Sequence, residues 1–169
     1  MMSHLTSISP RWRRRWIALA LLWFAFGCLI YNAAAQSPTM DEQNHLARGA
    51  ALLHTGDPRL SIEHPPLINV WAALPLSLLP EGVHLPLADW SWEQAEWYRF
   101  ADLFMWEANA NADLMVFLAR FPIIALTVWL AALVGRWARE LWGAPAGVLA
   151  MALVALSPNL LAHGSLVTT

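Results

Sequence analysis

The sequence contains no lysine, one cysteine and few charged residues of either sign. Charged residues make up 13% and hydrophobic residues 58%, against about 25% and 45–50% in an ordinary globular domain. Such hydrophobicity excludes a disordered chain. Cys28 has no second cysteine to pair with, which excludes a disulfide-stapled secreted scaffold. The formal net charge of −2 gives no basis for a nucleic-acid partner.

A glycine-rich phosphate loop, an internal repeat and an N-glycosylation sequon are also absent from the sequence. Ten arginines and eleven tryptophans are present instead. Tryptophan is enriched where a protein meets the membrane–water interface. Composition therefore favours a membrane protein, with membrane lipid among its partners.

Three apolar stretches are long enough to cross a bilayer, which takes about 20 residues. Residues 16–40 carry no charge, residues 114–135 carry only Arg120, and residues 141–169 carry no formal charge. We therefore predict an all-α, polytopic helical membrane protein with about three transmembrane helices. A fourth apolar run, 65–80, is short and broken by prolines, which favours a buried or interfacial segment.

Arginine distribution sets the predicted orientation. Segment 36–113 holds eleven of the twelve acidic residues but three of the ten arginines, and cytoplasmic loops collect arginine. This places 36–113 outside, in a multi-pass protein of the cell (inner) membrane whose active face lies outside the cytoplasm. The predicted division is a basic cytoplasmic N-terminus (1–15), a first transmembrane helix (16–35), an outer loop domain (36–113), a second helix (114–135), a cytoplasmic loop (136–142), a third helix (143–162) and an outer-side end (163–169).

The first stretch has a second interpretation. Four arginines at positions 11–15 precede an apolar run, and Ala33-Ala34-Ala35 follows it. A secretory signal peptide has the same order of basic, apolar and small residues. Whether residues 1–35 are cleaved stays open at this point, but the later spans predict a membrane protein either way.

Short juxtamembrane helices are predicted in the outer loop domain. Thr39 and Glu42 form a capping-box pattern, which begins a helix of about 15 residues that ends near Gly56. Its amphipathic pattern suits a helix lying along the membrane surface. A second helical stretch is predicted over 92–109, and 63–66 is predicted to be rigid and extended because of its diproline.

Several polar residues of this domain are candidates for chemistry, each with a simpler alternative. Asp41 and Glu42 suit a general base at the membrane surface, or only the positive end of a helix. The diproline preorganises Glu63 and His64; His64 can donate to a phosphate or only bond to Glu63. Arg120 is a charge in a span and so a functional candidate, or it snorkels to the interface.

A metal site is a further alternative. Asp41 and His45 stand four residues apart on one helical face, and Glu42, Glu63 and His64 are nearby in the sequence. The pattern is not His-Glu-x-x-His, and no cysteine assists. No cofactor is certain, and a divalent metal remains an open possibility.

These residues in this order resemble the first outer loop of the protein O-mannosyltransferase-like glycosyltransferases, which are polytopic GT-C enzymes. The resemblance rests on Asp41-Glu42, on His64-Pro65-Pro66, and on the tail from Ser157 to Ser165. It implies that the chain is the N-terminal part of a longer enzyme. Such enzymes transfer a sugar from a polyprenyl-phosphate carrier to an acceptor. The family often has a lysine shortly after His-Pro-Pro, where this chain has Asn69.

By this resemblance Asp41 is the general base that activates the acceptor, and Glu42 supports it. Attack inverts the anomeric carbon while the lipid phosphate leaves. His64 and Arg120 balance the charge of that phosphate, and Glu63 and His45 complete the predicted substrate-binding set. Two other functions remain open: a small non-catalytic membrane protein whose outer domain binds a partner, and a metal-dependent membrane enzyme.

Overall fold

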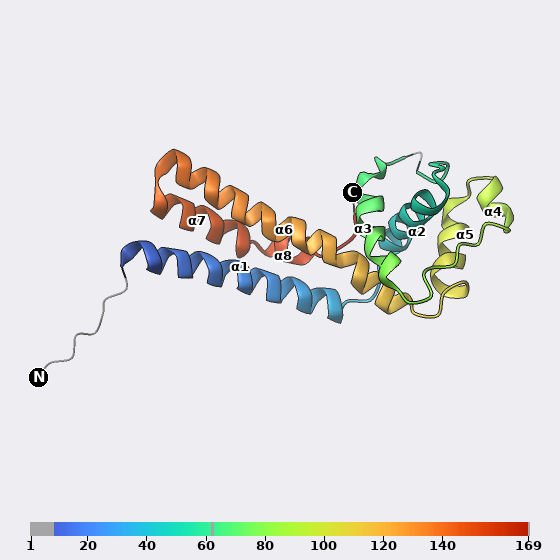
Figure 1. Cartoon of the computed structure of the whole chain (residues 1–169), viewed down its shortest axis with the longest axis horizontal. Helices are drawn as coiled ribbons and strands as arrows, with labels where there is room; N and C mark the ends of the chain where they lie inside the picture. Colours follow the sequence, from blue (N-terminus) through green and yellow to red (C-terminus); the bar gives the residue numbers. More distant parts are fainter. Residues whose placement is uncertain (1–8, 62, 169) are drawn as a thin grey trace, which may run out of the picture. The chain divides into compact units, whose positions relative to one another are not determined.

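The computed structural model describes residues 9–61 and 63–168, which form helices and no strand (Figure 1). This confirms the predicted all-α class. The elements are α1 (Pro10–Ala35), α2 (Met40–Thr55), α3 (Pro66–Ala73), the 3-10 helix η1 (Leu74–Leu78), α4 (Trp90–Glu93), α5 (Trp97–Asp102), the π-helix η2 (Leu103–Glu107), α6 (Ala112–Trp142), α7 (Ala144–Ala155) and α8 (Pro158–His163).

The chain divides into two compact units. The first contains α1 up to Leu29, α6 from Leu126 onward, α7 and α8. The second contains Ile30–Ala125 and the residues after Gly164. Every residue of the predicted site therefore belongs to the second unit.

Two helices of the described chain are long and apolar enough to cross a membrane. They run over Arg11–Ala35 and Ala112–Trp142, with mean hydropathies of 2.0 and 2.1. Most of the apolar side chains of α1 are exposed, Trp23 to 69% and Phe24 to 54%. Their positions agree with the first two predicted spans.

The third apolar stretch is not one continuous helix. α7 has 12 residues and ends at Ala155, and α8 begins at Pro158. Proline lacks the N–H that would continue the α7 hydrogen bonds, so the helix stops before Ser157-Pro158. α7 alone is shorter than a span requires, and a third crossing stays a prediction.

The segment 136–142 forms the last two turns of α6, so the prediction of a loop there is wrong. The chain turns at Gly143, whose φ of 87° lies in the left-handed region that favours glycine. Beyond this turn, α7 packs closely on α6: a methyl group on Gly135 would meet the Met151 side chain, and one on Gly147 would meet the Gly135 carbonyl oxygen.

The helix α2 begins and ends where the sequence predicts. Thr39 accepts a hydrogen bond from the Glu42 N–H, and the Glu42 carboxylate accepts one from the Thr39 N–H, which is a complete capping box. Gly56 ends the helix with a φ of 72°. Local sequence therefore determines both ends of this helix.

The apolar face of α2 is covered by protein, and its position at the membrane surface stays a prediction. Residues 44–51 are all buried, because α3, α5 and η2 pack around the helix. Gly49 allows the closest approach, since a Cβ there would overlap the backbone carbonyl of Asn69 in α3. An amphipathic pattern alone does not distinguish a lipid surface from a protein surface.

The second predicted outer helix, 92–109, is broken into three pieces. Ala95 has a φ of 53°, a left-handed conformation that ends α4 before α5 begins. The continuation η2 ends where the Asn109 amide donates to the Phe104 carbonyl. The 65–80 run forms α3 and η1, with Pro66 at the first turn of α3, so the predicted extended segment continues directly into a helix.

Candidate functional site

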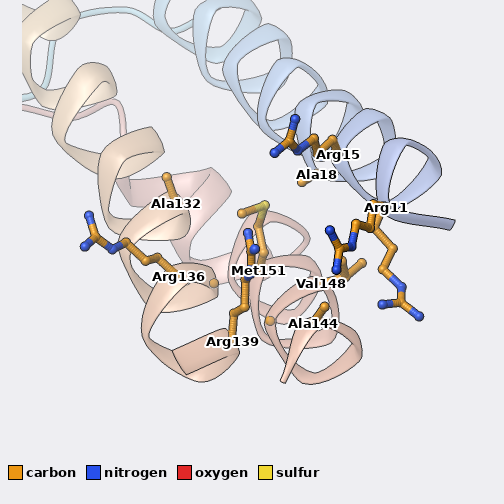
Figure 2. Close-up of a pocket in the computed structure, with 12 residues that line it drawn as sticks. Arg11, Arg15, Ala18, Ala132, Arg136, Arg139, Ala144, Val148 and Met151 are labelled. Carbon is orange, nitrogen blue, oxygen red and sulfur yellow. The ribbon is translucent and has the colours of Figure 1, made fainter. Parts of the chain in front are cut away.

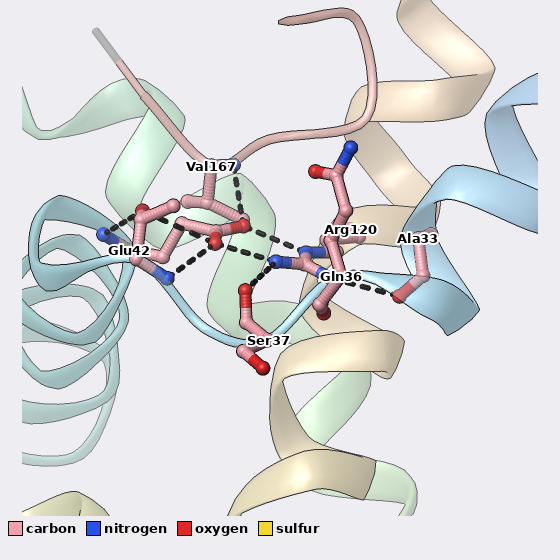
Figure 3. Close-up of polar contacts among 7 residues, drawn as sticks. Ala33, Gln36, Ser37, Glu42, Arg120 and Val167 are labelled. Carbon is pink, nitrogen blue, oxygen red and sulfur yellow. Dashed lines mark hydrogen bonds and ion pairs between the residues drawn. The ribbon is translucent and has the colours of Figure 1, made fainter. Parts of the chain in front are cut away.

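Apart from Asp41, the predicted site residues lie in two separate groups within the second unit. One is the Arg120 network, in which Arg120 of α6 binds Glu42 of α2 and the carbonyl groups at the end of α1 (Figure 3). The other, called here the His45 cluster, consists of His45, Arg48, Glu63, His64 and Asn69.

Arg120 is 1% exposed and uses all five of its N–H groups inside the chain. Its Nε and Nη2 atoms donate to the two oxygens of Glu42 at 2.8 and 2.7 Å. The remaining donations go to the carbonyl oxygens of Ala33, Gln36 and Ser37, at 2.8, 2.8 and 3.1 Å. A guanidinium has five N–H donors, so none remains for a carrier phosphate. This geometry favours a structural role over the predicted phosphate-binding one.

Glu42 is equally enclosed, at 1% exposure. Besides Arg120 and Thr39, its carboxylate accepts a hydrogen bond from the Val167 N–H at 3.1 Å. Burial alone would raise the pKa of Glu42, but the hydrogen bonds from Arg120, Thr39 and Val167 outweigh it and lower the pKa. Glu42 is therefore a buried anion that joins α2, α6 and the residues after α8.

Asp41, next to Glu42 in the sequence, points to a different environment. Its side chain is exposed, and nothing within residues 9–61 and 63–168 hydrogen-bonds or pairs with its carboxylate. It stands in the first turn of α2, where the helix dipole stabilises a negative charge. An accessible carboxylate is the form that a general base requires.

One turn further along α2, His45 is 6% exposed. Its Nδ1 lies 2.9 Å from the Asn69 Oδ1 atom, and its ring meets the His64 ring edge-on with 5.4 Å between centroids. Burial lowers the pKa of His45, the nearby charge of Arg48 lowers it further, and the Asn69 contact opposes this only in part. His45 is therefore neutral near pH 7 and fixed in orientation.

Arg48 completes the cluster and was not among the predicted site residues. It is 3% exposed, its guanidinium lies 4.1 Å from the Trp97 ring centre, and its Nη2 lies 3.6 Å from Glu63. In the described part of the chain, neither the Arg48 Nε nor the Asn69 amide nitrogen has a hydrogen-bond acceptor. Two buried donors are thus left without acceptors beside two histidines.

The sequence held a signal for Arg48 but none for Asn69. At 100° per residue, Arg48 shares a helical face with Asp41 and His45. Asn69 follows the diproline by only a few residues, yet its contact with His45 spans 24 positions of sequence. That contact depends on how α3 packs against α2, which no local pattern encodes.

No family model matches this chain, and comparison with curated proteins and with solved structures finds no similar protein. The resemblance to the O-mannosyltransferase-like enzymes therefore stays a prediction from sequence motifs.

For a metal ion, the arrangement offers little. Across residues 9–61 and 63–168, no three His, Cys, Asp or Glu side chains come together in a way that could hold one. Instead, the accessible carboxylate of Asp41 lies one helical turn from the His45 cluster, which contains two imidazoles and the buried guanidinium of Arg48. These groups are suited to moving a proton and to binding an anionic oxygen.

Proposed function

We propose that this chain is a membrane glycosyltransferase, or the N-terminal part of one, that moves a sugar from a polyprenyl-phosphate carrier to an acceptor. Transfer takes place outside the cytoplasm, beside α2, with inversion at the anomeric carbon. The proposal takes its reaction from the sequence motifs. The observation that carries it is the accessible Asp41 carboxylate one helical turn from the buried His45 ring.

In this proposal Asp41 is the general base. Its oxygen takes the proton of the acceptor hydroxyl as that hydroxyl attacks the anomeric carbon, and the bond from carbon to the carrier phosphate breaks. Glu42 is not a second base, because its carboxylate is already occupied by Arg120, Thr39 and Val167. Its role is to hold the first turn of α2, and so Asp41, in place.

The charge of the leaving phosphate is balanced by His64 and Arg48 rather than by Arg120. Arg48 retains a buried Nε donor without an acceptor, and half-buried His64 lies against His45. Glu63 pairs with Arg48 at 3.6 Å and orients it. A guanidinium and an imidazole placed at the developing negative charge stabilise the transition state.

Membrane insertion in this proposal uses α1 and α6. Retention of α1 is supported by its contact with the Arg120 network, since the Ala33 carbonyl accepts from Arg120 at 2.8 Å. Cleavage after Ala35 would remove that acceptor from a buried cation. In this proposal the chain keeps its first helix as a membrane anchor.

The experiment measures transfer of radiolabelled hexose from a polyprenyl-phosphate-linked donor to membrane acceptors, using membranes that contain the protein expressed from its whole reading frame. Acid–base assistance contributes roughly 10²–10⁴-fold, so Asp41→Asn should reduce turnover by about that factor. Asn keeps the size and polarity of the first-turn residue.

Thr39→Ala is the matched control, because it removes the helix cap but leaves the base. It should lower the amount of folded protein while leaving turnover per molecule nearly unchanged. Equal turnover per molecule for Asp41→Asn and wild type would refute the role of Asp41. If neither wild type nor Asp41→Asn transfers sugar although both insert into the membrane, the partner-binding function of the outer loop domain becomes the better explanation. Loss of transfer when a chelator removes divalent metal ions would favour the alternative of a metal-dependent membrane enzyme.

A further inference from the structure

A second polar site lies in the first unit, where the basic end of α1 meets the turn between α6 and α7. A cavity of about 530 Å³ is lined there by five arginines and several small side chains. This volume is within the range of about 300–1,000 Å³ that ligand sites occupy. The arginines are Arg11, Arg14 and Arg15 of α1, and Arg136 and Arg139 of α6.

The charges of this cavity are unbalanced. Among the described residues, the only acidic partner of the five arginines is Glu140, which lies 2.9 Å from Arg136. The N-terminus of α7 adds to the positive potential, because its N-cap Gly143 has no side chain to accept from the first N–H groups and Ala144 lines the cavity. Five guanidinium groups and one carboxylate leave a net positive charge, and a bound anion would reduce the repulsion among the arginines.

The residues that line the cavity indicate that its ligand has an apolar part as well as a negative charge. Figure 2 shows Arg11, Arg15 and Ala18 on the α1 wall and Ala132, Arg136 and Arg139 on the α6 wall, with Met151 between the two walls. Exposed tryptophans flank the same stretches of α1 and α6: Trp12, Trp16, Trp137 and Trp142 are 54%, 59%, 64% and 73% exposed. Arginine beside exposed tryptophan is the composition of a membrane interface.

We propose that this cavity binds the headgroup of an anionic phospholipid, with the phosphodiester among the arginines and the acyl chains along the apolar surfaces of α1 and α6. Basic pockets between helices are suited to such headgroups. The site depends on the proposed membrane insertion of α1 and α6 but not on glycosyl transfer, since none of its lining residues belongs to the second unit. The cavity has both arginine and apolar walls. A lipid can contact both kinds of wall, whereas free phosphate contacts only the arginines, so the proposed ligand is a lipid.

The test titrates detergent-solubilised full chain with phosphatidylglycerol or phosphatidylcholine and follows binding by native mass spectrometry. Phosphatidylglycerol should bind at least about tenfold more tightly, because no choline cation offsets its negative charge and each arginine near an anionic headgroup contributes about fivefold. Arg139→Gln should therefore weaken phosphatidylglycerol binding about fivefold, while Arg139→Lys, which keeps the charge, should retain it. Arg99→Gln, in the second unit, is the matched control and should bind like wild type.

Arg139 packs against Gly147, so a second variant on the exposed end of α1, Arg11→Gln with Arg14→Gln, guards against a folding defect. Equal affinity for the two lipids, or no change in both charge-removing variants, would overturn the proposal. Displacement of phosphatidylglycerol by an equal concentration of inorganic phosphate would assign the cavity to free phosphate instead. Carbonate extraction separately shows whether the chain is inserted, and the Asp41→Asn assay shows whether it transfers sugar.

Discussion

Arg120 and Glu42 form a bidentate ion pair across 78 positions of sequence, with both side chains 1% exposed. Each is occupied by partners from the chain itself, which leaves Arg120 no N–H for a carrier phosphate and gives Glu42 a supporting rather than a proton-accepting position. The pair joins the end of α1, the start of α2 and the first third of α6. A buried pair stabilises little compared with apolar packing, but breaking it leaves an uncompensated charge.

Removing one partner of this pair should therefore destabilise the second unit strongly. Arg120→Ala leaves the Glu42 carboxylate buried without its cation, and we expect a loss of about 3–5 kcal/mol in unfolding free energy. Thermal unfolding followed by circular dichroism in detergent measures it. Arg99→Ala removes an exposed pair with Asp89 and should change the midpoint far less. Equal shifts for the two variants would show that Arg120 is not structural.

Gly49→Ala should disrupt the contact between α2 and α3. Its new methyl group would overlap the carbonyl of Asn69, and overpacking of this kind costs about 1–3 kcal/mol. Because Asn69 also bonds to His45, the cluster should be disturbed as well. Gly27→Ala in α1 is the matched control, since a methyl group there meets nothing within 4 Å. A stabilised Gly49→Ala protein would mean that the two helices are not in this contact.

Stability should fall as the pH is lowered below about 6.5. The pKa of His45 is lowered in the folded state from its ordinary value of 6.5, so the unfolded chain binds the proton first and is favoured by acid. His45 therefore contributes its full stability above pH 6.5 and loses it as the pH falls toward the folded pKa. Glu42, whose pKa is also lowered, adds a second loss below its ordinary value of 4.5.

The measurement compares thermal midpoints between pH 8 and pH 5 for wild type, His45→Asn and the exposed-histidine control His84→Asn. His45→Asn should remove the loss that begins near pH 6.5, and His84→Asn should keep it. A pH dependence that survives His45→Asn would assign the loss to another group.

Topology can be tested with single cysteines in a Cys28→Ala background. Glu81 and Glu140 are both exposed, and the predicted orientation places the first outside and the second inside. In intact cells an impermeant thiol reagent should label Glu81→Cys at once and Glu140→Cys only after the membrane is opened. Labelling of Glu140→Cys alone would reverse the orientation.

Sequence patterns were reliable where the information is local. Thr39, Glu42 and Gly56 specify both ends of α2 because caps involve residues only a few positions apart. The lengths of the apolar stretches predicted α1 and α6 for the same reason. The 92–109 helix was predicted as one piece because nothing in the sequence indicates the left-handed Ala95 that breaks it.

The sequence by itself determined the helical class, the two long apolar helices, the asymmetry of charge along the chain and the group of polar residues near α2. Only the tertiary structure decided how those polar residues divide. It placed Glu42 and Arg120 together in a buried network, left Asp41 exposed, and added Arg48 and Asn69 to His45. The physical reason is that burial and hydrogen-bond partners depend on which helices pack together, and those contacts join residues from 24 to 125 positions apart.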